Sequence, residues 1–109
     1  MWFIFPQIQG LGFSETSKWY AVKDLREAEA FITTRLLGNR LVTICEALMQ
    51  NKNNDAYSIF GSPDDMKLLS CMTLFSSVKN AHPVFTEVAQ KFFGGAKDGR
   101  TLRIINAAI

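Results

Sequence analysis

Apolar residues recur at helical spacing along two stretches in the first half of the chain. The first stretch has one apolar face, formed by Leu25, Ala28, Phe31 and Ile32. Asp24 and Glu27 stand at its start with the spacing of a capping box, so we predict that this helix begins at Asp24. We expect a bend or a new helix start near Gly38-Asn39, and the second stretch continues from there to about Gln50. Its apolar stripe is formed by Leu41, Ile44, Cys45 and Leu48.

The strongest helix start in the chain is the sequence Ser62-Pro63-Asp64-Asp65. Ser62 is a favoured N-cap residue, Pro63 suits the first helical position, and the two aspartates oppose the positive end of the helix dipole. We expect this helix to run to Val78 or Lys79. Its apolar residues cover more than half a turn, which is typical of a central, largely buried helix. They are Leu68, Cys71, Met72, Leu74, Phe75 and Val78.

Glycine and proline divide the rest of the second half. We expect a short helical turn over residues 57–60, stopped by Gly61 in a left-handed conformation. The next helix is predicted to begin at Pro83 and to stop at Gly94-Gly95, and the last to begin at Asp98. The pattern as a whole predicts a mostly helical protein.

The N-terminal part lacks a regular amphipathic pattern. Residues 2–12 are apolar but interrupted by glycine and proline, so we expect extended or looped backbone lying on the core. Ser14 or Thr16 could cap a short helical turn that carries Trp19 and Tyr20. The aromatic residues of this part could form a stacking platform for a base, but we interpret them as core residues.

Composition and charge narrow the class of protein. A chain of 109 residues that is 48% hydrophobic is long enough for one domain, spanning residues 1–109, with a core that needs no disulfides. The formal charge of +2 is spread evenly, since each half holds six basic and five acidic side chains. A basic cluster near the C-terminus is interpreted as a solvated helix end: Lys91, Lys97, Arg100 and Arg103. We therefore expect no nucleic-acid partner.

The cysteines and the first residues bear on the compartment. Cys45 and Cys71 both fall in apolar helical patterns, and one pair in a chain with an adequate core favours reduced thiols. The opening MWFIFPQ lacks the basic region of a signal peptide, and Pro6 ends its apolar run. No segment reaches the roughly 18 apolar residues of a membrane span. We therefore expect a cytoplasmic protein that has no membrane partner.

Most motifs that suggest chemistry are weak. Gly10-Leu11-Gly12 lacks the strand–turn–helix context of a phosphate loop. His82 is the single histidine, stands directly before Pro83, and has no partners at metal-ligand spacing. We expect His82 to lie at a helix start, and we expect neither a metal nor a cofactor.

Asp64 and Lys67 form the best candidate pair. Three residues apart, they point toward the apolar side of the central helix, where they could hold a polar ligand or act as acid and base. The alternative is an ordinary ion pair, worth about 0.2–0.5 kcal/mol. We take Asp64 and Lys67 as the catalytic candidates, with Gln7 and Ser62 as ligand contacts from adjoining loops. Asp65 lies 100° further round the helix and is expected to lack a chemical role.

Several blocks of the chain resemble a known family when they are read together. They are MWFIFPQ, GLG, IFGSPDDMKLLSCMTLF and KFFGG, followed by DGRTL. These blocks are similar to the signatures of the bacterial domain-of-unknown-function family 1810, whose members are often mislabelled calpastatin. The resemblance covers nearly all of the chain, in order. It implies an all-α fold, a compact multihelical orthogonal bundle with an extended N-terminal loop segment.

The chain departs from the family pattern at three points. Cys71 stands where a small hydroxyl residue is usual, and Gly99 stands where proline is common. Family members usually carry a further helical segment ahead of the MWFIFPQ block, so we expect either a longer protein or a shortened gene. The apolar face that this segment would cover is then exposed, and we expect self-association with Trp2, Phe3 and Phe5 at or near the contact.

The sequence leaves function open between two classes. The family is faintly similar in general look to the NADAR proteins, small helical domains linked to ADP-ribose and to N-glycosidic bond cleavage. This implies a nucleotide- or ADP-ribose-related N-glycosidase or hydrolase, in which Asp64 or Asp65 assists the leaving group or activates water. The alternative is a non-catalytic ligand-binding or protein-interaction module. A concave pocket joining Asp64, Lys67 and the N-terminal block would favour the enzyme, and a closed surface there would favour the module.

Overall fold

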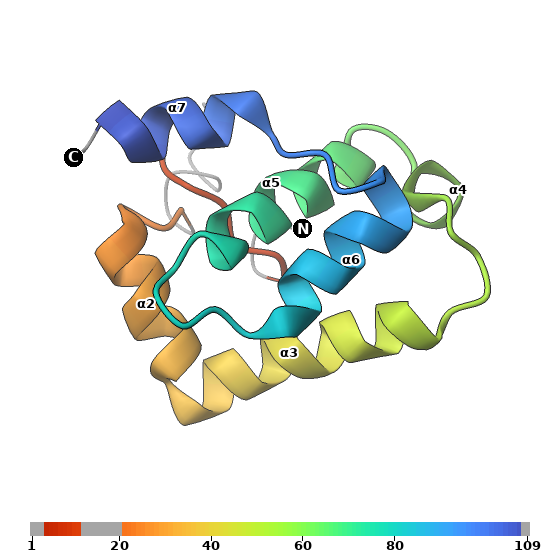
Figure 1. Ribbon diagram of the computed structural model, residues 1–109, viewed down its shortest axis with the longest axis horizontal. Coiled ribbons are helices and arrows are strands. Elements are labelled where there is room, and N and C mark those ends of the chain that lie inside the picture. The colour runs from red at the N-terminus through yellow and green to blue at the C-terminus, as the bar shows by residue number, and fades with distance from the viewer. Residues whose placement is uncertain (1–3, 12–20, 108–109) are drawn as a thin grey trace.

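The computed structural model describes residues 4–11 and 21–107, and these residues form six helices (Figure 1). The helices are α2 (Leu25–Thr33), α3 (Arg35–Gln50), α4 (Ala56–Phe60), α5 (Asp64–Ser76), α6 (Pro83–Phe93) and α7 (Gly99–Ala107). The prediction of an all-α bundle is confirmed. In the described ranges, β pairing is limited to an isolated bridge between Ile8 and Val22. None of the six helices is both long enough and apolar enough to cross a membrane.

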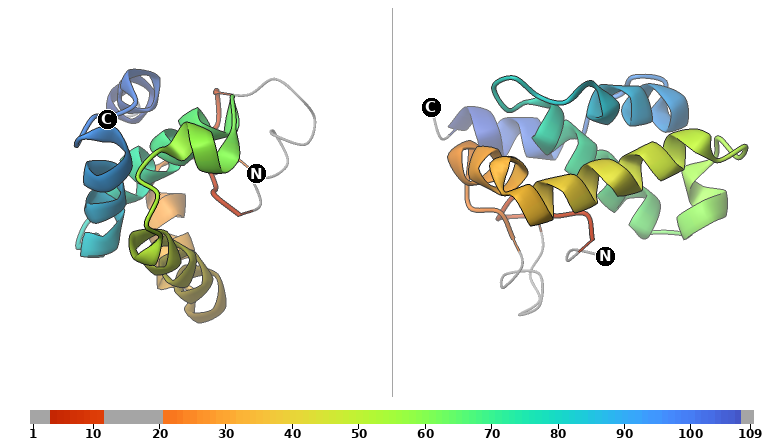
Figure 2. Two further views of the ribbon diagram at one scale, coloured as in Figure 1. Left: turned by 90° about the vertical axis from the view of Figure 1, so that its right-hand side faces the viewer. Right: turned by 90° about the horizontal axis from the view of Figure 1, so that it is seen from below.

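Helix α5 is the centre of the bundle, as its apolar arc predicts. It packs against α2, α4, α6 and α7, which surround it in Figures 1 and 2. Every residue from Leu68 to Phe75 is buried. The Phe75 ring lies 5.5 Å from that of Phe31 in α2 and 5.7 Å from that of Phe85 in α6, between ring centroids. The core therefore forms around α5 rather than along one face of it.

The start of α5 differs from the prediction. Ser62 is exposed and does not cap the helix, and Pro63 occupies the N-cap position rather than the first helical position. Backbone carbonyls bind the first amides instead: Asp65 donates its N–H to the Gly61 carbonyl at 2.9 Å, and Met66 donates to the Pro63 carbonyl at 3.1 Å. The helix also ends at Ser76 rather than at Val78 or Lys79.

The break between α2 and α3 also lies away from its predicted position. Asp24 caps α2 as predicted, since its Oδ1 accepts the Glu27 N–H at 2.9 Å. The chain then bends at Thr34, whose backbone N–H and hydroxyl both donate to the Ala30 carbonyl. Gly38 lies inside α3, where a Cβ would stand 2.0 Å from the Ile32 carbonyl oxygen. Glycine is thus needed here for close approach of the two helices, and it does not mark the bend.

Local caps set the remaining helices, and one of them differs from its prediction. Gly94 ends α6 in the left-handed conformation at a φ of 64°, as predicted. Gly61 ends α4 as predicted, but at a φ of 73° and a ψ of 179°, which is outside the left-handed helical region. His82 caps α6, because its Nδ1 accepts the Val84 N–H at 3.0 Å. Asp98 precedes α7 and accepts the Thr101 N–H at 3.0 Å.

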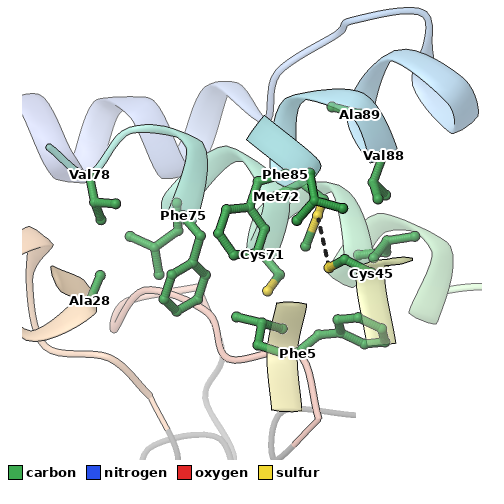
Figure 3. Packing of buried hydrophobic residues seen from close by; sticks show 14 of the residues in the cluster. Phe5, Ala28, Cys45, Cys71, Met72, Phe75, Val78, Phe85, Val88 and Ala89 are labelled. Atoms are coloured by element: carbon green, nitrogen blue, oxygen red, sulfur yellow. Dashed lines mark hydrogen bonds between the residues drawn. The ribbon is translucent and has the colours of Figure 1, made fainter. Parts of the chain in front are cut away.

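The N-terminal segment lies on the core, as predicted. Phe5 and Ile8 are almost fully buried, and the Gln7 carbonyl accepts the Val22 N–H at 2.8 Å. In Figure 3, Phe5 lies on the side of Cys71 opposite to α6. Phe5 is only 2% exposed, so its own ring packs in the core, and self-association near this segment stays a prediction.

Other expectations for the N-terminal part concern residues outside the described ranges. These are the contacts of Trp2 and Phe3, the cap at Ser14 or Thr16, and the turn with Trp19 and Tyr20.

Candidate functional site

The predicted catalytic pair lies in the first turn of α5. The Lys67 Nζ and the Asp64 Oδ1 are 3.5 Å apart, and the two side chains are 32% and 40% exposed. They therefore form an ion pair that remains accessible to a solute. The geometry is that of an i, i+3 pair on a helix, which by itself has no chemical role.

Gln7 is the unusual member of the predicted set. Its side chain is 2% exposed, and its Nε2 has no hydrogen-bond partner in the part of the chain that the structure describes. A buried donor without an acceptor is rare in folded proteins and needs an explanation. An unfilled ligand contact is one such explanation.

The segment that carries Gln7 contacts α4 through Phe5. Phe5 stacks edge-on against Phe60 of α4, with ring centroids 6.0 Å apart, and Phe60 precedes Asp64 by four residues. Ser62 is exposed in the short link between these two helices. The structure thus places Phe5 beside α4, while Ile8, next to Gln7, lies with the start of α2 and with α7. Among the described residues, no hydrogen bond or shared cavity joins Gln7 to Asp64 or Lys67. We call the predicted set of Gln7, Ser62, Asp64 and Lys67 the Gln7–α5 site.

Asp65 was expected to have no special role, but the surroundings of its carboxylate are unusual. Its Oδ1 is buried and has no hydrogen-bond partner among the described residues. Asp65 precedes Met72 by seven residues, so the two share one side of α5. The Met72 Sδ lies 3.8 Å from the Cys45 Sγ, which places that side toward α3. Asp65 as a whole is half-buried, and the burial of its Oδ1 could not be predicted, because the periodic pattern of α5 does not show which helices pack near this residue.

Three cavities lie elsewhere. One of about 270 Å³ lies between α2 and α7 and is lined by Ile8, Lys23, Asp24, Leu25, Arg26, Ile104 and Ile105. Ile8 is in the β-bridge next to Gln7, and adjacent side chains of extended backbone point to opposite sides. Two further cavities lie along the N-terminal half of α3 and share Arg40 and Ile44. None of the three is lined by a residue of the Gln7–α5 site.

The two thiols offer no nucleophile. Burial, and to a smaller extent the nearby Glu46 carboxylate, raises the pKa of Cys45 from 9.0 to about 12. Burial, and then the charge of Cys45, raises the pKa of Cys71 well above 9.0. Both thiols are free, as the sequence suggests. They remain protonated at neutral pH, and the thiol form is a poor nucleophile.

Other groups have structural roles. His82 caps α6 and its ring packs edge-on against Phe85, at 6.3 Å between centroids. Gly10 has a φ of 105°, which suits a corner, while Gly12 of the same motif lies outside the described residues. Across residues 4–11 and 21–107, no three His, Cys, Asp or Glu side chains are grouped as a metal site requires.

Comparison with known proteins gives a family and a fold. The sequence model of a family described as "Protein of unknown function (DUF1810)" matches residues 1–105. The crystal structure of the conserved hypothetical protein Rv1873 from Mycobacterium tuberculosis is similar, with 39% identity and a TM-score of 0.93. The match covers 96% of this chain and 75% of that chain. No curated protein matches the sequence.

Proposed function

The chain belongs to the DUF1810 family of proteins of unknown function, and from the Gln7–α5 site we propose that this member hydrolyses an N-glycosidic bond in a nucleotide- or ADP-ribose-related small molecule. One observation carries the proposal. The chain combines a buried amide nitrogen that has no partner among the described residues, Gln7 Nε2, with an accessible carboxylate–ammonium pair, Asp64 and Lys67.

Gln7 supplies ligand recognition in this proposal. A buried donor that lacks an acceptor costs about 1–3 kcal/mol relative to a satisfied one. A carbonyl or ring nitrogen of a nucleobase, or the oxygen of a carboxamide, accepts one hydrogen bond from Nε2 and removes that cost. Binding energy would thus come from satisfying a hydrogen-bond donor that has no partner in the free protein.

Asp64 supplies the chemistry. Its carboxylate takes a proton from a water molecule while the water oxygen bonds to the anomeric carbon of the sugar. The bond from that carbon to the base nitrogen breaks, and its electron pair goes to the nitrogen, which takes up the proton that Asp64 accepted. Lys67 holds the carboxylate in place from 3.5 Å and offers positive charge to a phosphate oxygen of the ligand. The exposed Ser62 hydroxyl adds a polar contact.

A second function is favoured by a different observation. Asp64 and Lys67 have the spacing and exposure of an ordinary surface ion pair, and the three cavities described above lie away from them. This arrangement supports a non-catalytic ligand-binding or protein-interaction module. In that case Gln7 could still contact a ligand, but Asp64 would have no role in turnover.

Ligand screening with matched variants separates the two functions. We expect ADP-ribose, NAD or a nucleoside to raise the melting temperature of the wild-type protein, and Gln7→Met to abolish that shift while raising the stability of the free protein. Asp64→Asn should lower turnover by about 10²–10⁴-fold. Asp65→Asn shares the helix end but lies on another side of α5, so it should leave turnover unchanged.

Two outcomes would contradict the enzyme. If Asp64→Asn and Asp65→Asn lower turnover equally, Asp64 has no special chemical role. If none of the three ligand classes shifts the melting temperature, the interaction module is the better function.

A further inference from the structure

The outer face of α3 is uncovered by the described residues. Its other sides pack against α2 and α6, and Figure 2 (right) shows α3 in front of the other helices. The residues that follow this face are all exposed, namely Leu36, Asn39, Arg40, Thr43, Glu46, Ala47 and Gln50. The large apolar side chain of Leu36 is 59% exposed on this face.

The N-terminal half of this face is hollowed and apolar in part. A hollow of about 560 Å³ is lined by Arg35, Leu36, Asn39, Arg40, Thr43 and Ile44. A second one, of about 270 Å³, adjoins it and is lined by Ile4, Phe31, Leu37, Arg40, Leu41 and Ile44. The two hollows thus form one continuous, partly apolar surface, and continuous apolar surface is typical of interaction sites.

Charge is divided between the two halves of the face. Arg35 and Arg40 lie in the N-terminal half, and Glu46 lies in the C-terminal half. None of the three has an ion-pair partner among the described residues. The first turn of α3 also contains no acidic residue, and the Thr34 side chain makes no capping bond. The cationic half therefore lacks a complement within its own helix.

We propose that this face binds a second copy of the chain, with the two α3 helices antiparallel. Arg40 and Glu46 lie three residues on either side of Thr43. A two-fold axis at Thr43 therefore sets Arg40 of each copy opposite Glu46 of the other, which forms two equivalent ion pairs. The small side chains of Thr43 and Ala47 permit close approach of the helices.

The same symmetry fills the hollow. With the axis at Thr43, the C-terminal half of one α3 lies over the N-terminal half of the other, so Ala47 and Gln50 of the second copy face the hollow beside Leu36. A second copy thus supplies the anionic group that this face lacks, and it covers the hollow with the small side chain of Ala47 and the amide of Gln50. An acidic helix of another protein could complement the arginines as well, but it would leave Glu46 without a partner.

Charge reversal with rescue tests the pairing. We expect sedimentation equilibrium to show a monomer–dimer equilibrium for the wild-type chain. Arg40→Glu and Glu46→Arg should each weaken dimerisation by about tenfold, and the double variant should restore it. Arg103→Glu on α7 and Glu87→Arg on α6 are matched controls, since both side chains are exposed and lie off this face.

A cross-linking measurement locates the contact independently. Because Cys45 and Cys71 are buried, Thr43→Cys creates a single accessible thiol. A short bismaleimide should join two such chains efficiently and should not join two Lys97→Cys chains. A wild-type chain that stays monomeric at its solubility limit would overturn the proposal, as would single reversals without effect, a double variant that fails to recover, or equal cross-linking at both positions.

Discussion

Cys45 and Cys71 show how burial sets the chemistry of a residue. Both side chains are fully buried, and the Cys45 Sγ lies 3.8 Å from the Met72 Sδ. Ionisation of either thiol would place a charge in an apolar core, so their pKa values are raised. The unfolded chain carries no such penalty, and its thiols ionise near 9.0. The two states therefore bind different numbers of protons above that pH.

We predict that this difference lowers stability at alkaline pH. Between 9.0 and about 12, the unfolded chain releases a Cys45 proton that the folded chain retains. The free energy of unfolding should fall by about 1.4 kcal/mol per pH unit from Cys45 over this range. Urea denaturation at a series of pH values measures the slope. The double variant Cys45→Ala, Cys71→Ala should have a shallower slope, and an unchanged slope would show that the thiols do not contribute.

Residue roles could be predicted only where the environment is local. Cys45 and Cys71 stood in apolar patterns, so their burial was predictable. The unpartnered Nε2 of Gln7 was not, because it depends on what the fold places around the amide. The buried Oδ1 of Asp65 was missed for the same reason. Periodicity reports the face of one helix, and it does not report how many neighbours surround that helix.

At the helix ends, predictions were correct where the sequence nearby sets the cap, and they failed where contacts with other parts of the chain set it. The caps at Asp24 and Asp98 were predicted correctly, since each acts on amides three residues away. The cap predicted at Ser62 was wrong, and the break predicted near Gly38 lies four residues earlier, at Thr34. At Ser62 the backbone carbonyls of the preceding link capture the amides, and at Gly38 a neighbouring helix sets the need for glycine.

Lys91 of α6 caps the C-terminus of α3, and we predict that this contact stabilises the fold. Its Nζ donates to the carbonyls of Leu48 at 2.7 Å, Met49 at 3.0 Å and Asn51. The last turn of α3 has no basic residue of its own. Lys91→Met should therefore lower the free energy of unfolding by about 2 kcal/mol, because charged hydrogen bonds to orphan carbonyls are lost. Thermal or urea unfolding measures the loss. The control Lys97→Met alters an exposed side chain, and equal stability of both variants would contradict the prediction.

At the scale of the whole molecule, the fold class was predictable and the assembly was not. Apolar periods and caps predict a helical bundle with a central α5, and the family resemblance agrees with it. The packing of α3 against α6, however, joins residues about 40 positions apart through contacts such as that of Lys91. Only the folded structure shows which face of α3 remains uncovered. For the N-terminal segment, the sequence predicted that it lies on the core, but it did not predict which helices the segment contacts.

The N-terminal segment is part of the core, and substitution of Phe5 tests how much it contributes to stability. The ring is 2% exposed and packs edge-on against Phe60, so it links the N-terminal segment to α4. Phe5→Ala removes a large buried side chain and leaves a cavity, which should lower the free energy of unfolding by about 3–5 kcal/mol. Ile4→Ala is the matched control, because Ile4 is 39% exposed and its loss should change stability by less than about 0.5 kcal/mol. Urea denaturation of both variants measures the difference. If the two variants are equally stable, the bundle holds together without the N-terminal segment, and Gln7 loses the rigid support that the proposed site requires.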